Sequence, residues 1–215
     1  AVGNPYGDGY YDDFNTAVGL DSAGRTQLHH KGKLVIGVEN TPTVIFDLMQ
    51  FLVIDLGGVV GQIGMGQHGT AFAHAGMRMG PAICYEGLYG DFYGDFVRRG
   101  AQFMAIISND GWWGDTPGYK HLFTISRLRA IEHRRAIARS ANTGMSGFIS
   151  ARGDIGETLG WEKRGVISAA VPLNSELTFY TRYGDYLGRI AEYLTLLCVL
   201  YYIAYRVKKK NYLVK

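Results

Sequence analysis

The apolar and polar positions of the first thirty residues predict a β-hairpin. Residues 14–20 and 26–30 are short extended runs, and the sequence DSAGR separates them. A polar, glycine-containing stretch of this length is typical of a hairpin connection. We therefore expect two antiparallel strands that end directly before Lys31.

Strand and helix patterns then alternate along the chain. Residues 79–84 and 103–108 are apolar runs, which indicate buried strands. Between them, residues 88–99 place large apolar side chains on one side at helical spacing, and Gly100 is a natural helix stop. This alternation predicts a layered α/β fold.

A longer helical pattern covers residues 119–140. Five residues trace its expected apolar face: Leu122, Ile125, Leu128, Ile131 and Ile137. Five arginines occupy the rest, and we expect them to be solvated or paired with carboxylates: Arg127, Arg129, Arg134, Arg135 and Arg139. After this helix, residues 146–150 and 166–171 predict two more strands, with a turn at 151–154.

Two other segments are strongly apolar. Residues 44–56 carry only Asp47 and Asp55 as charges, which fits either a core helix or a lipid-facing arm. Residues 190–205 contain a single charge, Glu192. Sixteen helical residues span only about 24 Å, whereas a bilayer core of about 30 Å needs roughly 20 residues. Flanking tyrosines and the basic residues that follow nevertheless favour a membrane span.

Charge is concentrated at the C-terminal end. The whole chain of 215 residues has a formal charge of +3, and residues 206–215 carry five cations and no acid. The remaining residues therefore have a net charge of −2, and no basic stripe is left to bind nucleic acid. Apolar residues make up 47% of the chain and there are 30 glycines, a composition that fits a turn-rich α/β fold.

Cys84 is the candidate nucleophile. The two cysteines, Cys84 and Cys198, form no C-x-x-C pair, so we expect neither a disulfide framework nor a metal site. Cys84 lies where a predicted strand meets a predicted helix, which exposes a side chain beside free backbone N–H groups. A buried, unreactive thiol is the alternative. Lys31 is a candidate for stabilising an oxyanion, although a solvated surface lysine would have the same local sequence.

Five sequence blocks carry a resemblance to a known family. Residues 30–39 read HKGKLVIGVE, residues 81–86 read PAICYE, and residues 109–115 read NDGWWGD. The blocks RLRAIE and RSANTG follow at residues 127–132 and 139–144. In order and content these blocks resemble the apolipoprotein N-acyltransferase branch of the nitrilase superfamily, and the resemblance runs from about residue 14 to residue 189.

The resemblance implies a fold and a set of site residues. The fold would be a nitrilase-like αββα sandwich, with residues 1–189 as the C-terminal part of that domain, 190–206 as a membrane helix and 207–215 as a basic cytoplasmic tail. Cys84 would form the acyl-thioester, and Lys31 would stabilise the oxyanion. Glu39 would support Lys31 or the substrate. Tyr85 and Glu86 would shape the pocket, with the Tyr85 N–H as an oxyanion donor.

The sequence departs from the family pattern at three points. Ile36 replaces a usual proline, and Gly32 is small for its place. The superfamily's general base is a glutamate on an earlier strand, whereas residues 1–38 contain no glutamate. We therefore interpret the chain as a fragment whose base and other membrane helices lie upstream, and we expect it to be inactive alone.

The implied reaction moves a fatty acyl chain from a phospholipid, through the cysteine, to the N-terminal amine of an apolipoprotein. It needs neither metal nor cofactor. The enzyme would lie in the bacterial inner membrane with this domain in the periplasm. Two alternatives remain: a soluble amidase or carbamoylase with the same site, and an inactive fragment with a structural role.

Overall fold

The computed structural model describes all residues except 1, 4–10, 36–38, 40–62 and 214–215. The predicted segment 44–56 therefore lies outside the described residues, as does Ile36. The elements in chain order are β1 (Val2–Gly3), β2 (Tyr11–Asp12), β3 (Thr16–Leu20), β4 (Thr26–His30), β5 (Phe72–His74), β6 (Met77–Ile83), the 3₁₀ helix η1 (Cys84–Leu88), α2 (Gly90–Arg98), β7 (Phe103–Ser108), the 3₁₀ helix η2 (Gly111–Trp113), α3 (Pro117–His133), β8 (Ile137–Ala141), β9 (Ser146–Ile149), β10 (Ile155–Leu159), α4 (Phe179–Tyr183) and α5 (Tyr186–Leu213).

A six-stranded mixed sheet organises the body. Its strand order is β10-β9-β8-β7-β6-β5. The three central strands, β6, β7 and β8, are parallel to one another, and the outer pairs are antiparallel. The parallel connections run through α2 and α3, which is the βαβ arrangement expected for an α/β fold. The predicted α/β class is confirmed.

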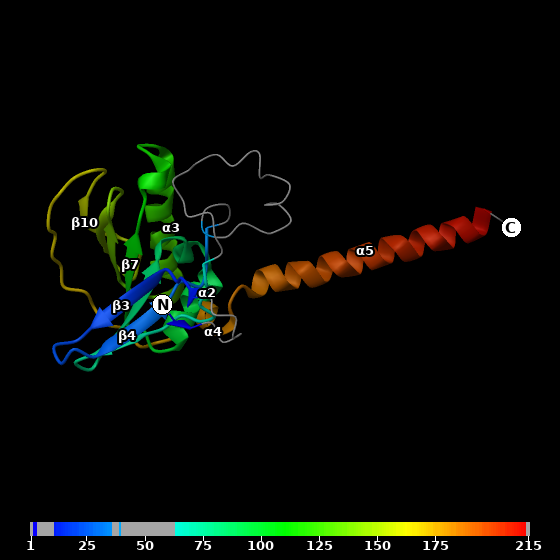
Figure 1. Cartoon of the computed structure of the whole chain (residues 1–215). Coiled ribbons are helices and arrows are strands. Elements are labelled where there is room, and N and C mark those ends of the chain that lie inside the picture. Colours follow the sequence, from blue (N-terminus) through cyan, green and yellow to red (C-terminus); the bar gives the residue numbers. More distant parts are fainter. Residues whose placement is uncertain (1, 4–10, 36–38, 40–62, 214–215) are drawn as a thin grey trace.

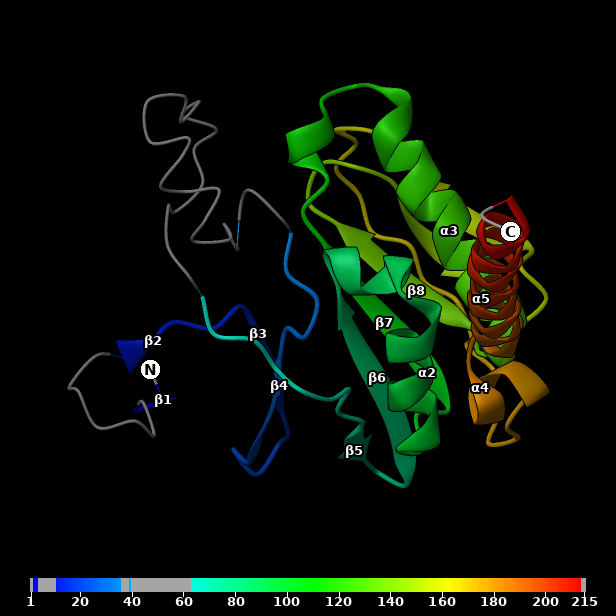
Figure 2. The same ribbon diagram turned by 90° about the vertical axis from the view of Figure 1, so that its right-hand side faces the viewer.

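The sheet is covered differently on its two faces (Figure 2). Helices α2 and α3 pack on one face, where the largest buried cluster includes Phe96 from α2, Met104 and Ile106 from β7, and Ile137 from β8. The β3–β4 hairpin lies on the other side, where Ala17 packs with sheet residues that include Ile83. Alternate residues of the strands therefore face two different apolar layers.

Local patterns located several elements correctly. The hairpin forms as predicted, with Thr16 opposite His30 and Leu20 opposite Thr26. Asp21 closes its turn by accepting hydrogen bonds from the backbone N–H groups of Ala23 and Arg25. Strand β7 has the predicted bounds, and helix α2 ends one residue before the predicted limit of the helix.

The predicted helix over residues 119–140 was wrong at its C-terminal end. Helix α3 stops at His133 because Arg134 takes a left-handed conformation, with φ of 51°. The chain then enters β8, where Ile137 pairs with Met104 of β7. A residue in the left-handed region commonly ends a helix, although glycine is the usual choice.

The buried face of α3 also differs from the predicted one. Leu128 is 49% exposed and Ile131 is 46% exposed, whereas Arg129 is 9% exposed. The face that packs on the body contains Tyr119, Leu122, Phe123, Ser126, Arg129, Ala130 and His133. Arg129 pairs at 3.0 Å with Glu132 of the same helix, and tertiary packing adds the Leu88 carbonyl oxygen at 3.4 Å, so the buried guanidinium has partners.

The last predicted strand was misplaced. Residues 166–171 pair with no strand among the described residues, and Val166 is 95% exposed. The strand after the predicted turn is instead β10, which pairs antiparallel with β9 at the edge of the sheet. The turn itself forms, with the Gly153 N–H donating to the Ser150 carbonyl.

Helix α4 fastens the C-terminal helix to the body. His133, at the end of α3, lies 2.8 Å from Thr181 Oγ1 and 3.1 Å from the Gly90 carbonyl oxygen. Burial and the nearby Arg129 lower the pKa of His133 to about 3, so the ring is neutral at neutral pH. Nε2 therefore donates to the carbonyl of Gly90 and Nδ1 accepts from Thr181.

Helix α5 is longer than the predicted segment 190–205. It begins at Tyr186 and projects away from the body (Figure 1). Residues Tyr186–Arg206 form a 21-residue stretch that is long and apolar enough to cross a membrane, and none of it is buried. At 1.5 Å per residue this stretch is about 32 Å long, close to the thickness of a bilayer core.

Candidate active site

Cys84 occupies a strained turn at the end of a central strand. It follows β6 directly and begins η1, and its φ is 47°. This left-handed region is costly for a residue with a Cβ atom, by about 1–3 kcal/mol, and persists only where the surroundings enforce it. A sharp strand-to-helix turn of this kind presents a nucleophile above the sheet.

A cavity of about 520 Å³ opens at Cys84. Its lining contains Lys31, Glu39, Cys84 and Tyr85, four of the five site residues expected from the sequence. Apolar and aromatic side chains form much of the remaining wall: Val35, Ile83, Ile107, Trp112, Trp113 and Leu122. The structure thus brings a thiol, an ammonium group and a carboxylate to one largely apolar pocket.

Lys31 is buried and paired with Glu39. Its side chain is 2% exposed, and Nζ lies 2.8 Å and 2.7 Å from the two carboxylate oxygens of Glu39. Burial acts to raise the pKa of Glu39, but the hydrogen bonds from Lys31 and from the Val35 N–H outweigh it and leave that pKa below its ordinary value. Asn15 adds a third donor, at 3.0 Å.

Lys33, the other lysine of this loop, points elsewhere. Its Nζ lies 5.2 Å from the ring centre of Tyr89 and 5.4 Å from that of Phe92, which are cation–π contacts. Lys33 does not line the cavity. Lys31 is therefore the lysine that can reach a group bound at Cys84.

Gly32 is small because the loop is packed tightly on both sides. A Cβ atom there would clash with the Phe92 ring and would lie 2.8 Å from the Gly66 carbonyl oxygen. The departure from the family pattern at this position is thus matched by a close approach of two neighbouring segments.

Glu86 lies beneath the cavity rather than in its wall. The side chain is fully buried, and its carboxylate accepts hydrogen bonds from the backbone N–H groups of Gly32 and Ile83, each at 2.6 Å. His29 Nε2 lies 3.1 Å from both oxygens. Sequence reasoning placed Glu86 near the pocket but did not indicate that its carboxylate faces away from it.

A buried ion pair holds the tryptophan loop at the cavity edge. Asp110 is fully buried, and its oxygens lie 3.0 Å and 2.9 Å from Arg139 Nη2. Arg139 comes from β8, not from the predicted helix. The pair fixes the start of the loop that carries Trp112 and Trp113, which are 53% and 45% exposed.

Sequence reasoning did not single out three asparagines of the cavity: Asn15, Asn109 and Asn142. Asn109 begins the matched block NDGWWGD. Asn15 lines the wall and donates to Glu39, and Asn142 lines it from the end of β8. Nothing in the local sequence of Asn15 distinguishes it. Asn142 lies within the matched block RSANTG, which was the available signal.

Comparison with known proteins decides the family. Residues 2–177 match the carbon-nitrogen hydrolase family. The chain belongs to this family. The nitrilase-like fold expected from the motifs is therefore confirmed.

Relatives of this chain include proteins named as acyltransferases. An apolipoprotein N-acyltransferase of Chlorobaculum tepidum is 36% identical over 181 residues, which is 81% of this chain and 34% of that protein. The corresponding protein of Verminephrobacter eiseniae is 34% identical over 178 residues, covering 79% of this chain and 32% of the relative. The chain spans about a third of the length of these relatives. The predicted resemblance to apolipoprotein N-acyltransferases is confirmed.

Solved structures agree on the fold. Saccharomyces cerevisiae Nit3, a member of branch 10 of the nitrilase superfamily, superposes with a TM-score of 0.52 at 18% identity, covering 70% of this chain and 51% of Nit3. An amidase of Nesterenkonia gives a TM-score of 0.50 at 17% identity, covering 68% and 52%. At these identities the likeness concerns the fold alone.

Proposed function

We propose that the protein transfers a fatty acyl chain from a phospholipid to the N-terminal amine of a diacylglyceryl-cysteine apolipoprotein. The observation that carries the proposal is the apolar cavity that joins Cys84 to the ion pair of the buried Lys31 with the partly buried Glu39. Two observations support the lipid substrate: the relatives named apolipoprotein N-acyltransferase, and the exposed apolar helix of this chain.

The proposed chemistry has two halves. The Cys84 thiolate attacks the ester carbonyl, and Lys31 stabilises the resulting oxyanion as its charge develops. The C–O bond then breaks, a lysophospholipid leaves with a proton, and an acyl-thioester remains. The acceptor amine attacks this thioester, the C–S bond breaks, an amide forms and the thiol recovers a proton.

The proton acceptor for Cys84 is proposed to be the glutamate that the family carries on an earlier strand. Among the described residues that line the cavity, Glu39 is the one carboxylate, and both its oxygens face Lys31. Glu39 is therefore assigned to holding Lys31. Tyr85 follows Cys84 at the start of η1, where backbone N–H groups lack helical partners, and its N–H is the proposed second oxyanion donor.

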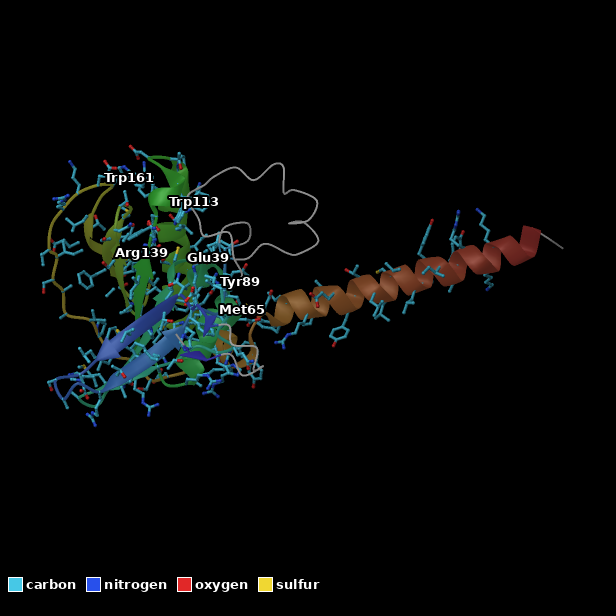
Figure 3. The ribbon with its side chains drawn as sticks, viewed as in Figure 1. Glu39, Met65, Tyr89, Trp113, Arg139 and Trp161 are labelled. Carbon is cyan, nitrogen blue, oxygen red and sulfur yellow. The ribbon has the colours of Figure 1, made fainter. Side chains whose placement is uncertain are left out.

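The direction of the cavity fits a substrate drawn from a bilayer. Figure 3 shows Glu39, which lines the cavity, on the side of the body nearest α5, with Trp161 on the opposite side. If α5 spans the membrane, the cavity lies on the membrane-facing side of the domain. We propose residues 1–189 as the catalytic part, 190–206 as the span and 207–215 as a cytoplasmic tail. An amidase acting on small soluble substrates would need no such helix.

The reaction itself is tested with full-length protein in detergent, a phospholipid labelled in its acyl chain and a diacylglyceryl-cysteine peptide. We expect the label to appear on the peptide amine and one molecule of lysophospholipid to be released for each labelled peptide. A peptide with an acetylated amine is the control and should receive no label. Hydrolysis of small amides or ureido compounds without any labelled peptide would instead favour the amidase.

Topology gives a second, independent prediction. We expect a reporter that is active only in the periplasm to be silent when fused after Lys215 and active when inserted after Lys163. Lys163 is exposed at the end of a turn, so an insertion after it should leave the fold intact. The turn at 151–154 is a poorer insertion site, because Gly153 is buried and takes a positive φ of 85°. The reverse pattern of activity, or release of the protein by high salt, would contradict the span.

A further inference from the structure

A fully buried pair, His29 and Glu86, lies outside the cavity and has no part in the mechanism above. Both side chains are 0% exposed. His29 is on β4, two residues before Lys31, and Glu86 is in η1, two residues after Cys84. The pair therefore joins the two segments that carry the proposed oxyanion donor and the nucleophile.

The Glu86 carboxylate clamps these segments through their backbones. One oxygen accepts from the Gly32 N–H and the other from the Ile83 N–H, both at 2.6 Å. Gly32 directly follows Lys31 in the chain, and Ile83 directly precedes Cys84. Rotation or displacement of this carboxylate would move the Lys31 loop relative to the strained turn at Cys84.

His29 completes the hydrogen bonding of that carboxylate. Its Nε2 lies 3.1 Å from each oxygen, and its ring packs against Phe96 with centres 4.8 Å apart. Nδ1 has no hydrogen-bond partner among the described residues. A carboxylate oxygen accepts hydrogen bonds, so the geometry puts a proton on Nε2, aimed at Glu86.

We propose that His29 is a positioning residue of the acyl-transfer site. Its Nε2–H fixes the Glu86 carboxylate, and the carboxylate in turn holds Lys31 in register with Cys84. The role in turnover rests on the proposed function. The expected effect on the reactivity of Cys84 rests on the geometry alone. Alkylation of Cys84 therefore tests the role of His29 independently of acyl transfer.

The test compares His29→Gln with His29→Asn and His29→Leu in the full-length protein. The amide nitrogen of glutamine can occupy the place of Nε2, whereas asparagine reaches only the place of Nδ1 and leucine donates nothing. We expect the Asn and Leu variants to lose kcat by roughly 10- to 100-fold with little change in KM, the range for losing a hydrogen bond to a charged group. The Gln variant should stay close to the unsubstituted protein.

A second readout does not depend on the substrate. The rate at which iodoacetamide alkylates Cys84, followed by peptide mass spectrometry against a cysteine-free peptide of the same protein, should fall in the same order. His30→Asn is the matched control, because His30 contacts Thr16 and Phe14 rather than Glu86. It should leave kcat and alkylation unchanged.

Two outcomes would overturn the proposal. Unchanged kcat and Cys84 alkylation in the Asn and Leu variants would make His29 an ordinary core residue. An equal loss in the Gln variant would show that the donated hydrogen bond is not the cause. If the Leu variant does not fold, the Gln and Asn pair decides, since both are amides. If the unsubstituted protein transfers no acyl chain, the proposed function fails, while the alkylation series still decides the role of His29.

Discussion

Replacing Cys84 with alanine is expected to lower the rate of acyl transfer by roughly 10⁴-fold or more, which brings it down to the background of the assay. The reason is that the thioester forms on this sulfur and no other nucleophile can take its place at the turn above β6. Alanine keeps the Cβ atom and so keeps the left-handed backbone under the same strain. The measurement is intact-protein mass spectrometry after incubation with phospholipid and no acceptor.

The unsubstituted protein should show one acyl adduct that hydroxylamine removes, and the Cys84→Ala variant should show none. Cys198→Ala is the matched control: this second cysteine is exposed on α5, far along the chain from the cavity residues, and the adduct should persist without it. A thioester that remains in Cys84→Ala and disappears in Cys198→Ala would contradict the assignment of the nucleophile.

Replacing Lys31 with methionine is expected to lower turnover by about 10²- to 10³-fold, the range for losing one oxyanion-stabilising donor. Methionine keeps most of the apolar volume in a site that is 2% exposed but removes the charge. Glu39 would then keep its hydrogen bonds from Val35 and Asn15 and lose its cation. The measurement is kcat and KM in the labelled-lipid assay, with the melting temperature followed in parallel.

Lys33→Met provides the comparison within the same loop. This side chain stacks on Tyr89 and Phe92 outside the cavity, so its loss should change turnover by less than about fivefold. Near-normal turnover in Lys31→Met, or a larger loss in Lys33→Met, would remove Lys31 from the proposed role.

Much of the fold was predictable because the relevant signals are local. The hairpin before Lys31, the strand over residues 103–108 and the helix after Cys84 follow from alternation, turn residues and a glycine stop within a few positions. The family blocks are local too, and they were sufficient to predict the family and the cavity residues Cys84 and Lys31. Helix α5 was found from its composition, although its start at Tyr186 was not.

Tertiary contacts decided the rest. The end of α3 and the start of β8 depend on a ladder with β7, which a helical periodicity cannot indicate. Arg129 lies on the buried face of α3 because packing brings the Leu88 carbonyl within reach of its guanidinium, which also pairs with Glu132 of the same helix. Residues 155–159 became a strand because β9 offered a partner, while residues 166–171 had the apolar pattern but pair with no strand in the described part of the chain.

At the site, the sequence by itself determined which chemical groups are present: a thiol at 84, an ammonium at 31, and carboxylates at 39 and 86. It left open where each of them points. The structure turns Glu39 toward Lys31 in the cavity and Glu86 away from it, toward Gly32, Ile83 and His29. The physical reason is that a carboxylate shielded from water goes where N–H donors can satisfy it. For Glu86, two of these donors, Gly32 and His29, lie more than fifty residues away in the chain, so local sequence could not indicate them.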